Sequence, residues 1–373
     1  MMHFQIPAYH APDFSRPEIR QAPCVTFLSA PADGVAPDNY HATSVFPEYF
    51  HLQSGEWVLL QESRMDAVVR IDSGNLLSVV ELRHLAAGDQ VACGRRENGE
   101  DGILVHTQAF DFPIHIMEKF AFRSHLTRET SFSIDYDELY QLMDYEKTNG
   151  FMVWVLGPAV VFDRDARNAF VALIERGYVH ALLAGNALAT HDVEGAIFGT
   201  ALGQEIYTKQ TTPLGHYRHL DAINRIRTAG SITQAVQSGI VRNGIMHAVI
   251  RKNIPFVLAG SIRDDGPLPE VVGNAYEAQD NMRRLTRKAT TVIGMATQLH
   301  TIAAGNMIPA YRVMGNLVRP VYFYSVDMSE FAVSKLVDRG SLTARSILTN
   351  VQDFVVTVER GLRDRFPEYP IEN

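Results

Sequence analysis

The hydrophobic pattern of the chain changes between residues 125 and 150. Before that point, short apolar runs alternate with polar segments, which is typical of β-strands joined by turns. These runs are Glu56–Leu60, Ala67–Ile71, Leu76–Leu82 and Gln90–Gly94. We expect them to form a meander or a small barrel, which is too small to be the whole protein.

After residue 150, apolar runs of strand length alternate with stretches of helical spacing. The predicted strands are 151–156, 179–184, 254–259, 290–296 and 320–326. The predicted helices are 164–176, a stretch ending at 198, 220–228, 232–252, 274–288, one beginning near 300, 330–338 and 353–363. This alternation predicts an α/β fold with a parallel sheet that helices cover on both faces.

The composition indicates a globular protein, because 46% of the 373 residues are hydrophobic and 20% are charged. A formal net charge of −8 disfavours nucleic acid or an acidic membrane as a partner. No apolar run is long enough for a transmembrane helix, and Met1–Pro12 lacks the pattern of a signal peptide. The two cysteines, Cys24 and Cys93, are too few for a disulfide scaffold, so we expect a cytoplasmic protein with free thiols.

Polar or glycine-containing loops follow four of the predicted strands. Because the carboxyl ends of parallel strands lie along one edge of a sheet, these loops can line one crevice. The most distinctive loop places Arg263, Asp264 and Asp265 together directly after a buried strand, although a solvated turn is the alternative interpretation. The loops are Gly185–Ala187, Gly260–Gly266, Thr297–His300 and the one that begins at Asp327.

The last two of these loops have the layout of a dinucleotide half-site. Thr297 stands where a helix begins, and Asp327 ends the next strand, which suits a phosphate at the helix N-terminus and a ribose at the carboxylate. Either residue is equally a common helix cap. The glycine fingerprint G-x-G-x-x-G is absent, so the sequence does not support an ordinary dehydrogenase motif.

Several histidines are candidates for proton transfer. His216 and His219 share a face if they are helical, and His191, His247 and His300 add to the group. Spacing alone permits a metal, but the chain shows no recognised metal-binding signature, so we expect none.

The N-terminal part offers polar groups for a substrate. Arg64 lies between two β-runs and suits a substrate carboxylate. Asp66 or Glu97 suits an amine, although Glu97–Gly99 is also a turn signal.

Together these segments resemble the ornithine cyclodeaminases of the archaeal and cyanobacterial type, also known as lysine-oxoglutarate reductase/saccharopine dehydrogenase-like (LOR/SDH) proteins. The resemblance covers roughly residues 45 to 365 and is most specific in the ten residues from Gly260. The motifs are Phe46–Phe50, Glu62–Asp66, Arg96–Ile103, Gly157–Val161, Ala181–Ala189, His191–Glu194, Ala222–Ile232, Phe256–Pro269 and Val337–Ser341.

The resemblance implies a β-rich N-terminal domain over residues 1–125, for substrate binding or oligomerisation, and a deoxyhypusine-synthase-like, Rossmann-type NAD-binding domain over residues 126–373. It further implies that the chain acts on ornithine, since it carries no arginine dihydrolase domain. Two departures, Ala67 in place of cysteine and the sequence His216–His219, affect the expected substrate end. The implied NAD contacts are Asn186, Ala187, Asp265, Thr297, Gln298, Leu299, His300, Asp327, Asn350 and Val351.

The leading hypothesis is conversion of L-ornithine to L-proline and ammonia, with hydride removed from C2 by NAD⁺ and later returned. In it, Arg64 clamps the carboxylate, Asp264 or Asp265 lies near the nicotinamide, and His216 or His219 transfers protons. The alternatives are an amino-acid or opine-type dehydrogenase, a cyclodeaminase of lysine or 2,4-diaminobutyrate, and a non-catalytic NAD-occupied sensor. We expect a homo-oligomer.

Overall fold

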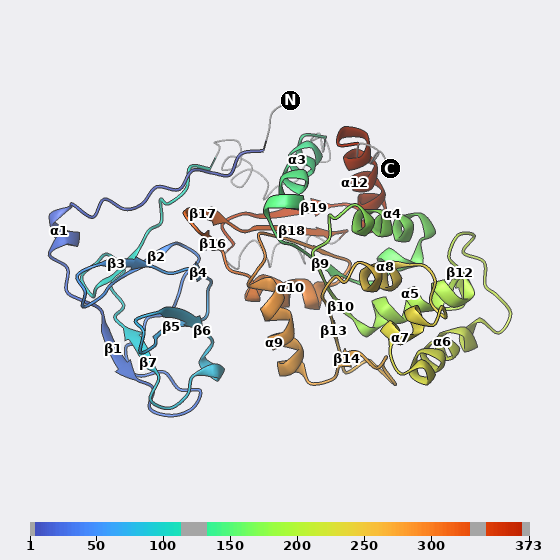
Figure 1. The fold of residues 1–373 in the computed structure, drawn as a ribbon, viewed down its shortest axis with the longest axis horizontal. Coiled ribbons are helices and arrows are strands. Elements are labelled where there is room, and N and C mark those ends of the chain that lie inside the picture. The colour runs from blue at the N-terminus through green and yellow to red at the C-terminus, as the bar shows by residue number, and fades with distance from the viewer. Residues whose placement is uncertain (1–3, 113–132, 329–340, 368–373) are drawn as a thin grey trace.

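The computed structural model describes residues 4–112, 133–328 and 341–367. Figure 1 shows a β-rich N-terminal region beside a larger α/β region. The predicted domain boundary near residue 125 and the predicted helix 330–338 lie outside the described residues. No helix in the described ranges is both long and apolar enough to cross a membrane.

The α/β region is built on a seven-stranded parallel sheet with the order β14-β13-β10-β9-β15-β18-β19. From β9 the chain moves outward through β10, β13 and β14, and then returns to the other side of β9 as β15. The strand order therefore reverses between β9 and β15, which is where open α/β sheets bind ligands. The strands are β9 (Met152–Leu156), β10 (Ala181–Gly185), β13 (Phe256–Ala259), β14 (Val271–Val272), β15 (Thr291–Met295), β18 (Tyr322–Asp327) and β19 (Ala344–Leu348).

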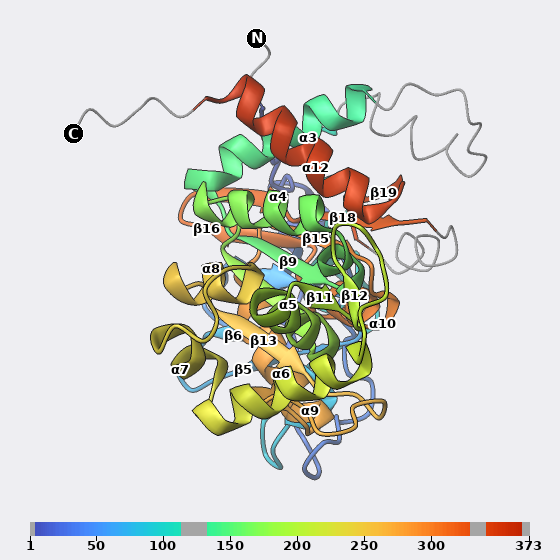
Figure 2. The same cartoon turned by 90° about the vertical axis from the view of Figure 1, so that its right-hand side faces the viewer.

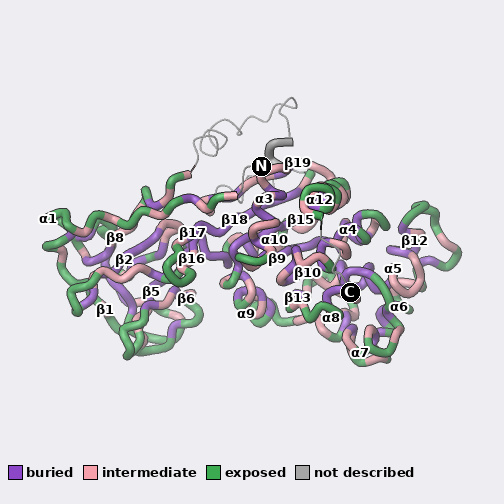
Figure 3. Tube along the Cα trace, turned by 45° about the horizontal axis from the view of Figure 1, so that its top comes forward, coloured by how far each residue is buried: buried purple, intermediate pink, exposed green. Residues whose placement is uncertain are grey.

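Helices cover both faces of this sheet, as the sequence predicts. In β9, Trp154 faces a core formed with α3, α4, α5, α6, α7, α8 and α12, whereas Val153 and Val155 face a second core formed with α9 and α10. Figure 2 shows α12 lying across α3 and α4, and Figure 3 shows the central strands buried between the layers. The helices are α3 (Ser133–Asn149), α4 (Arg164–Glu175), α5 (Asn186–Phe198), α6 (Gly215–Ala229), α7 (Ile232–Gln237), α8 (Ile245–Arg251), α9 (Ala275–Thr286), α10 (Gln298–Met307) and α12 (Val351–Arg365), with the 3₁₀ turn η2 (Pro158–Phe162).

The N-terminal region contains antiparallel sheets that include the four predicted strands. One sheet has the order β1-β7-β5-β6, so β7 pairs with β5 and the strands do not form a simple meander. A second sheet has the order β3-β2-β8. The elements are α1 (Pro17–Arg20), β1 (Thr26–Ser29), β2 (Glu48–His51), β3 (Trp57–Leu59), β4 (Glu62–Ser63), β5 (Val68–Ile71), β6 (Leu77–Val80), η1 (Leu82–His84), β7 (Gln90–Cys93) and β8 (Ile103–Val105).

The structure differs from the sequence prediction in several elements. The helix expected over 232–252 is divided into α7 and α8, because Gly239 and Gly244 between them have φ angles of +74° and +101°, which are not helical. Helix α3 and strand β19 were not predicted. Nor was the hairpin of β16 (Tyr311–Met314) and β17 (Leu317–Pro320), which pairs with β4 and so joins the two regions.

Candidate active site

Two strand ends are in direct contact where the sheet order reverses. The backbone N–H of Gly157, after β9, donates to the carbonyl oxygen of Met295 in β15 at 2.8 Å. A Cβ atom on Gly157 would overlap the carbonyl oxygen of Ala296, so only glycine permits this approach. Ala296 itself has a φ of +59°, which is unusual for alanine and typical of strained functional loops. This turn places the start of α10 directly at the reversal point.

Two helices begin at this edge without a side-chain cap. Thr297 precedes α10 and Gly185 precedes α5, and neither makes a capping hydrogen bond with its side chain. By contrast, Asp163, Asn274 and Asn350 cap α4, α9 and α12. The first backbone N–H groups of α5 and α10 thus have no capping side chain within the described residues, and the positive ends of both helix dipoles favour an anion there.

His300, in the first turn of α10, lies between three strand-end loops. Its Nδ1 is 3.4 Å from the hydroxyl of Thr297, and a Cβ atom on Gly185 would come within 2.8 Å of its Cε1. Burial lowers the pKa of His300 below its ordinary value, while the charge of Asp264 opposes this shift. The imidazole is therefore neutral near pH 7 and can accept a proton.

The charged loop after β13 is held by its own side chains. Asp264 accepts a hydrogen bond from the backbone N–H of Ser261 at 2.8 Å, whereas the side chains of Arg263 and Asp265 are exposed. The loop is tied to α5, because the Asn186 side-chain oxygen accepts from the backbone N–H of Leu268 at 3.1 Å. The structure thus brings Asn186, Asp264 and His300 to the same edge.

The remaining predicted cofactor contacts lie along this edge. Ala187 follows Asn186 in α5, and Gln298 and Leu299 are exposed in the first turn of α10. Asp327 ends β18, the parallel neighbour of β15, as a dinucleotide half-site requires. Across the register from Asp327, Leu348 ends β19, and Asn350 and Val351 follow as the cap and first residue of α12.

The two histidines predicted for proton transfer have different surroundings. His216 is exposed, and its ring lies against that of Tyr217 at a centroid distance of 4.4 Å, with the two planes tilted by 40°. The ring of His219 lies 5.0 Å from that of His191, and its Nδ1 is 3.6 Å from the carboxylate of Glu194. Burial alone would raise the pKa of Glu194, but the nearby imidazoles of His191 and His219 and hydrogen bonds from Gly203 and Thr200 hold that pKa well below its usual range. Only His219 thus belongs to a buried polar cluster.

Arg64 already has a carboxylate partner. Its buried guanidinium pairs with Glu81 and donates to the Asn306 carbonyl, at the C-terminal end of α10, at 3.4 Å. Glu81 also binds Arg283 at 2.6 Å, so this network connects the N-terminal region to α9 and α10. The carboxylate clamp therefore stays a prediction that requires Glu81 to release Arg64.

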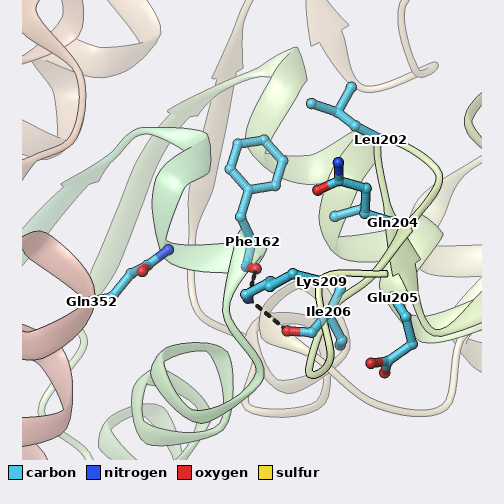
Figure 4. Close-up of a pocket in the computed structure, with 8 residues that line it drawn as sticks. Phe162, Leu202, Gln204, Glu205, Ile206, Lys209 and Gln352 are labelled. Carbon is cyan, nitrogen blue, oxygen red and sulfur yellow. Dashed lines mark hydrogen bonds between the residues drawn. The ribbon is translucent and has the colours of Figure 1, made fainter. Parts of the chain in front are cut away.

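A pocket of about 280 Å³ lies next to the His191–Glu194–His219 cluster. Its Phe162 ring is 5.0 Å from the ring of His191, and its Leu202 donates a backbone N–H to Glu194. Figure 4 shows Lys209 below the Phe162 ring, donating to the carbonyl oxygens of Phe162 and Ile206. The pocket reaches α12 as well, because Gln352 both lines it and donates to the carbonyl of Ala159 in η2.

Sequence reasoning missed three residues of this region. Gly157 was quoted only as the first residue of a motif, and its position before a proline was the available signal. Ala296 gave no signal, because alanine rarely adopts a positive φ. Glu194 stands in a quoted motif, but its partner His219 lies on another helix, and sequence spacing does not reveal such proximity.

Comparison with known proteins identifies the family. Residues 138–358 match the family described as "Arginine dihydrolase ArgZ-like, C-terminal, Rossmann fold". Ornithine cyclodeaminase of Archaeoglobus fulgidus is 38% identical over 89% of this chain and 77% of its own length. Ornithine cyclodeaminase of Methanopyrus kandleri is 37% identical over 90% of this chain and 77% of its own length.

Solved structures agree with this result. A LOR/SDH protein from Methanococcus maripaludis is 34% identical, covering 93% of this chain and 98% of that one, with a TM-score of 0.79. AgrE in a ternary complex with ornithine and NAD⁺ is 30% identical, covering 94% of this chain and 47% of that one, with a TM-score of 0.58. These matches show the family: the chain belongs to the ornithine cyclodeaminase family.

Proposed function

We propose that this protein is an NAD-dependent ornithine cyclodeaminase that converts L-ornithine into L-proline and ammonia. The observation that carries the proposal is the convergence of two uncapped helix N-termini and His300 at the point where the sheet order reverses. Proteins named ornithine cyclodeaminase match most of this chain, and AgrE binds both ornithine and NAD⁺. These similarities select the reaction among those that the fold permits.

The strand ends fit a dinucleotide. The first backbone N–H groups of α10, from Gln298 to His300, would donate to the pyrophosphate, and Asp327 would accept from a ribose hydroxyl. Asn350 and Val351 would border the adenosine side, and Asn186, Ala187 and Asp265 the nicotinamide side. When bound, NAD⁺ supplies a hydride acceptor for C2 of the substrate and a hydride donor for the ring product.

The protein's own groups would handle the protons and the substrate charge. His300 is neutral because it is buried, so it can accept the proton that the α-ammonium group must lose before C2 is oxidised. Asp264, beside it, would attract the ammonium groups of a diamino acid. His216 and His219 stay predictions for proton transfer. The structure favours His219 of the two, because it is the one that lies in the buried cluster.

The second candidate is a dehydrogenase, in which NAD(H) exchanges and is consumed. The assay that separates the two supplies L-ornithine, lysine or 2,4-diaminobutyrate to the purified protein and measures cyclic product, ammonia and NADH. Equal amounts of proline and ammonia from ornithine without NADH support the proposal. NADH that rises in step with ornithine loss identifies a dehydrogenase. If no diamino acid reacts but NAD stays bound, the sensor is the better description.

We further propose that the protein works in the cytoplasm, that it supplies proline, and that it assembles from identical subunits. Two cysteines with no disulfide between them support the first point. We retain the division at residue 125, with the β-rich part contributing to substrate binding or oligomerisation. Size-exclusion chromatography with light scattering tests the assembly.

A further inference from the structure

Three metal-ligating side chains converge between α5 and α6. His191 and Glu194 are three residues apart in α5 and share one face of that helix, and His219 reaches them from α6. One ligand atom from each of the three residues lies within 4.8 Å of the others. Glu194 is fully buried and His191 nearly so.

Hydrogen bonding alone does not satisfy this cluster. The Oε1 atom of Glu194 accepts from the hydroxyl of Thr200 at 2.9 Å and from the backbone N–H of Gly203 at 3.0 Å. Its Oε2 atom accepts from the backbone N–H of Leu202 at 3.0 Å, which leaves one lone pair for two imidazoles.

The two imidazole nitrogens compete for that lone pair at long range. The Nδ1 atoms of His191 and His219 lie 3.4 and 3.6 Å from Oε2, beyond the usual length of an N–H···O bond. The Nδ1 atom of His219 is buried and has no hydrogen-bond partner in the described part of the chain. Two ring nitrogens thus point at one oxygen without bonding it well.

The two nitrogen–oxygen separations match the edge of a coordination tetrahedron. With metal–ligand bonds of roughly 2.0–2.1 Å, neighbouring ligand atoms are about 3.4 Å apart. A cation between the three residues would use the remaining lone pair of Glu194 and the unpartnered nitrogen of His219. Thr200 and Gly203 would orient the carboxylate from behind, as outer partners do in metal sites.

We propose that His191, Glu194 and His219 form a binding site for a divalent transition-metal ion, with Zn²⁺ the best fit. Two imidazoles and one carboxylate suit zinc and its neighbours, whereas calcium and magnesium prefer oxygen ligands. Three protein ligands leave a fourth position open, as in catalytic zinc sites. The site is separate from the dinucleotide contacts proposed above and does not depend on them.

The test measures metal binding by the whole chain, produced without a polyhistidine tag. The protein is treated with a chelator, loaded with Zn²⁺, desalted and analysed for zinc per chain. Loading with Co²⁺ then reports geometry, because a tetrahedral site gives intense visible absorption. We expect one ion per chain and the tetrahedral spectrum.

Two substitutions locate the site. His219→Ala, at a partly exposed position, should weaken binding at least about 100-fold, since even the loss of an outer-shell partner weakens binding 10- to 100-fold. His216→Ala is the matched control on the same helix and should leave binding unchanged. Glu194→Gln is a second test, with circular dichroism to show that it folds.

A wild-type chain that retains no zinc and gives no tetrahedral Co²⁺ spectrum would overturn the proposal. So would His219→Ala protein that binds as well as the wild type.

Discussion

Gly157 and Ala296 are 139 positions apart in sequence, yet their backbones are in contact at the reversal point of the sheet, and a side chain on Gly157 would overlap the Ala296 carbonyl. This contact brings the end of β9 against the turn that starts α10. The proposed pyrophosphate position therefore depends on the absence of one Cβ atom.

Gly157→Ala should separate these strand ends and weaken NAD binding. Overpacking of this kind destabilises a protein by about 1–3 kcal/mol, and it also displaces the N–H groups of α10. The matched control is Gly273→Ala, since nothing lies within 4 Å of a Cβ atom there. Calorimetric titration with NAD⁺ measures the effect, and equal affinities for the two variants would contradict the proposed role of the contact.

Asp327→Ala should reduce NAD affinity about tenfold or more, because a hydrogen bond to a charged group contributes about 1.5–3 kcal/mol. Asp165→Ala, an exposed acidic residue in the first turn of α4, is the control. If the amount of bound NAD is the same in both variants, the half-site is placed wrongly.

The acid limb of kcat/KM should follow His300. Because burial lowers its pKa, the neutral, proton-accepting form should persist below pH 6.5, the ordinary value of the group. Activity should therefore fall only as the pH drops through that lowered pKa. Asp264 opposes the shift, so Asp264→Asn should move the limb to still lower pH. A limb that stays in place in both Asp264→Asn and His300→Asn protein would exclude His300 as the base.

Arg64→Met should act mainly on stability. Breaking a buried ion pair lowers the free energy of unfolding by about 3–5 kcal/mol. Because Glu81 would keep its ion pair with Arg283, the loss should lie near the lower end of that range. Arg83→Met, which removes a half-exposed pair with Asp280, should change stability by less than about 1 kcal/mol. Urea unfolding measures both. Unchanged stability with a raised KM for ornithine would instead support the carboxylate clamp.

The sequence predicts the central sheet well because its strands are buried on both faces and appear as continuous apolar runs, as in β9 and β15. The sequence also predicts that Thr297 and Asp327 lie at neighbouring strand ends, because the alternation of strands and helices implies a parallel sheet. It does not predict the division of α7 from α8, because the helical spacing continues across residues whose glycines have positive φ angles.

Contacts between distant segments are the other part that the sequence leaves out. In the sequence, Arg64 has no evident partner and suits a substrate carboxylate. In the fold, its guanidinium forms an ion pair with Glu81. In the sequence, nothing distinguishes His219 from the other histidines. In the fold, the packing of α5 against α6 places it beside Glu194. In each case the chemistry depends on tertiary distance, which spacing along one element does not encode.

Isotope transfer tests the central claim most directly. L-Ornithine carrying deuterium at C2 is converted by the protein in ordinary water, and the proline is analysed by mass spectrometry and NMR. If hydride leaves C2 and returns from the same cofactor molecule, proline should retain deuterium at C2 while no reduced cofactor accumulates. Proline without deuterium, or deuterium recovered in released NADH, would contradict internal hydride return and with it the proposed cyclodeamination.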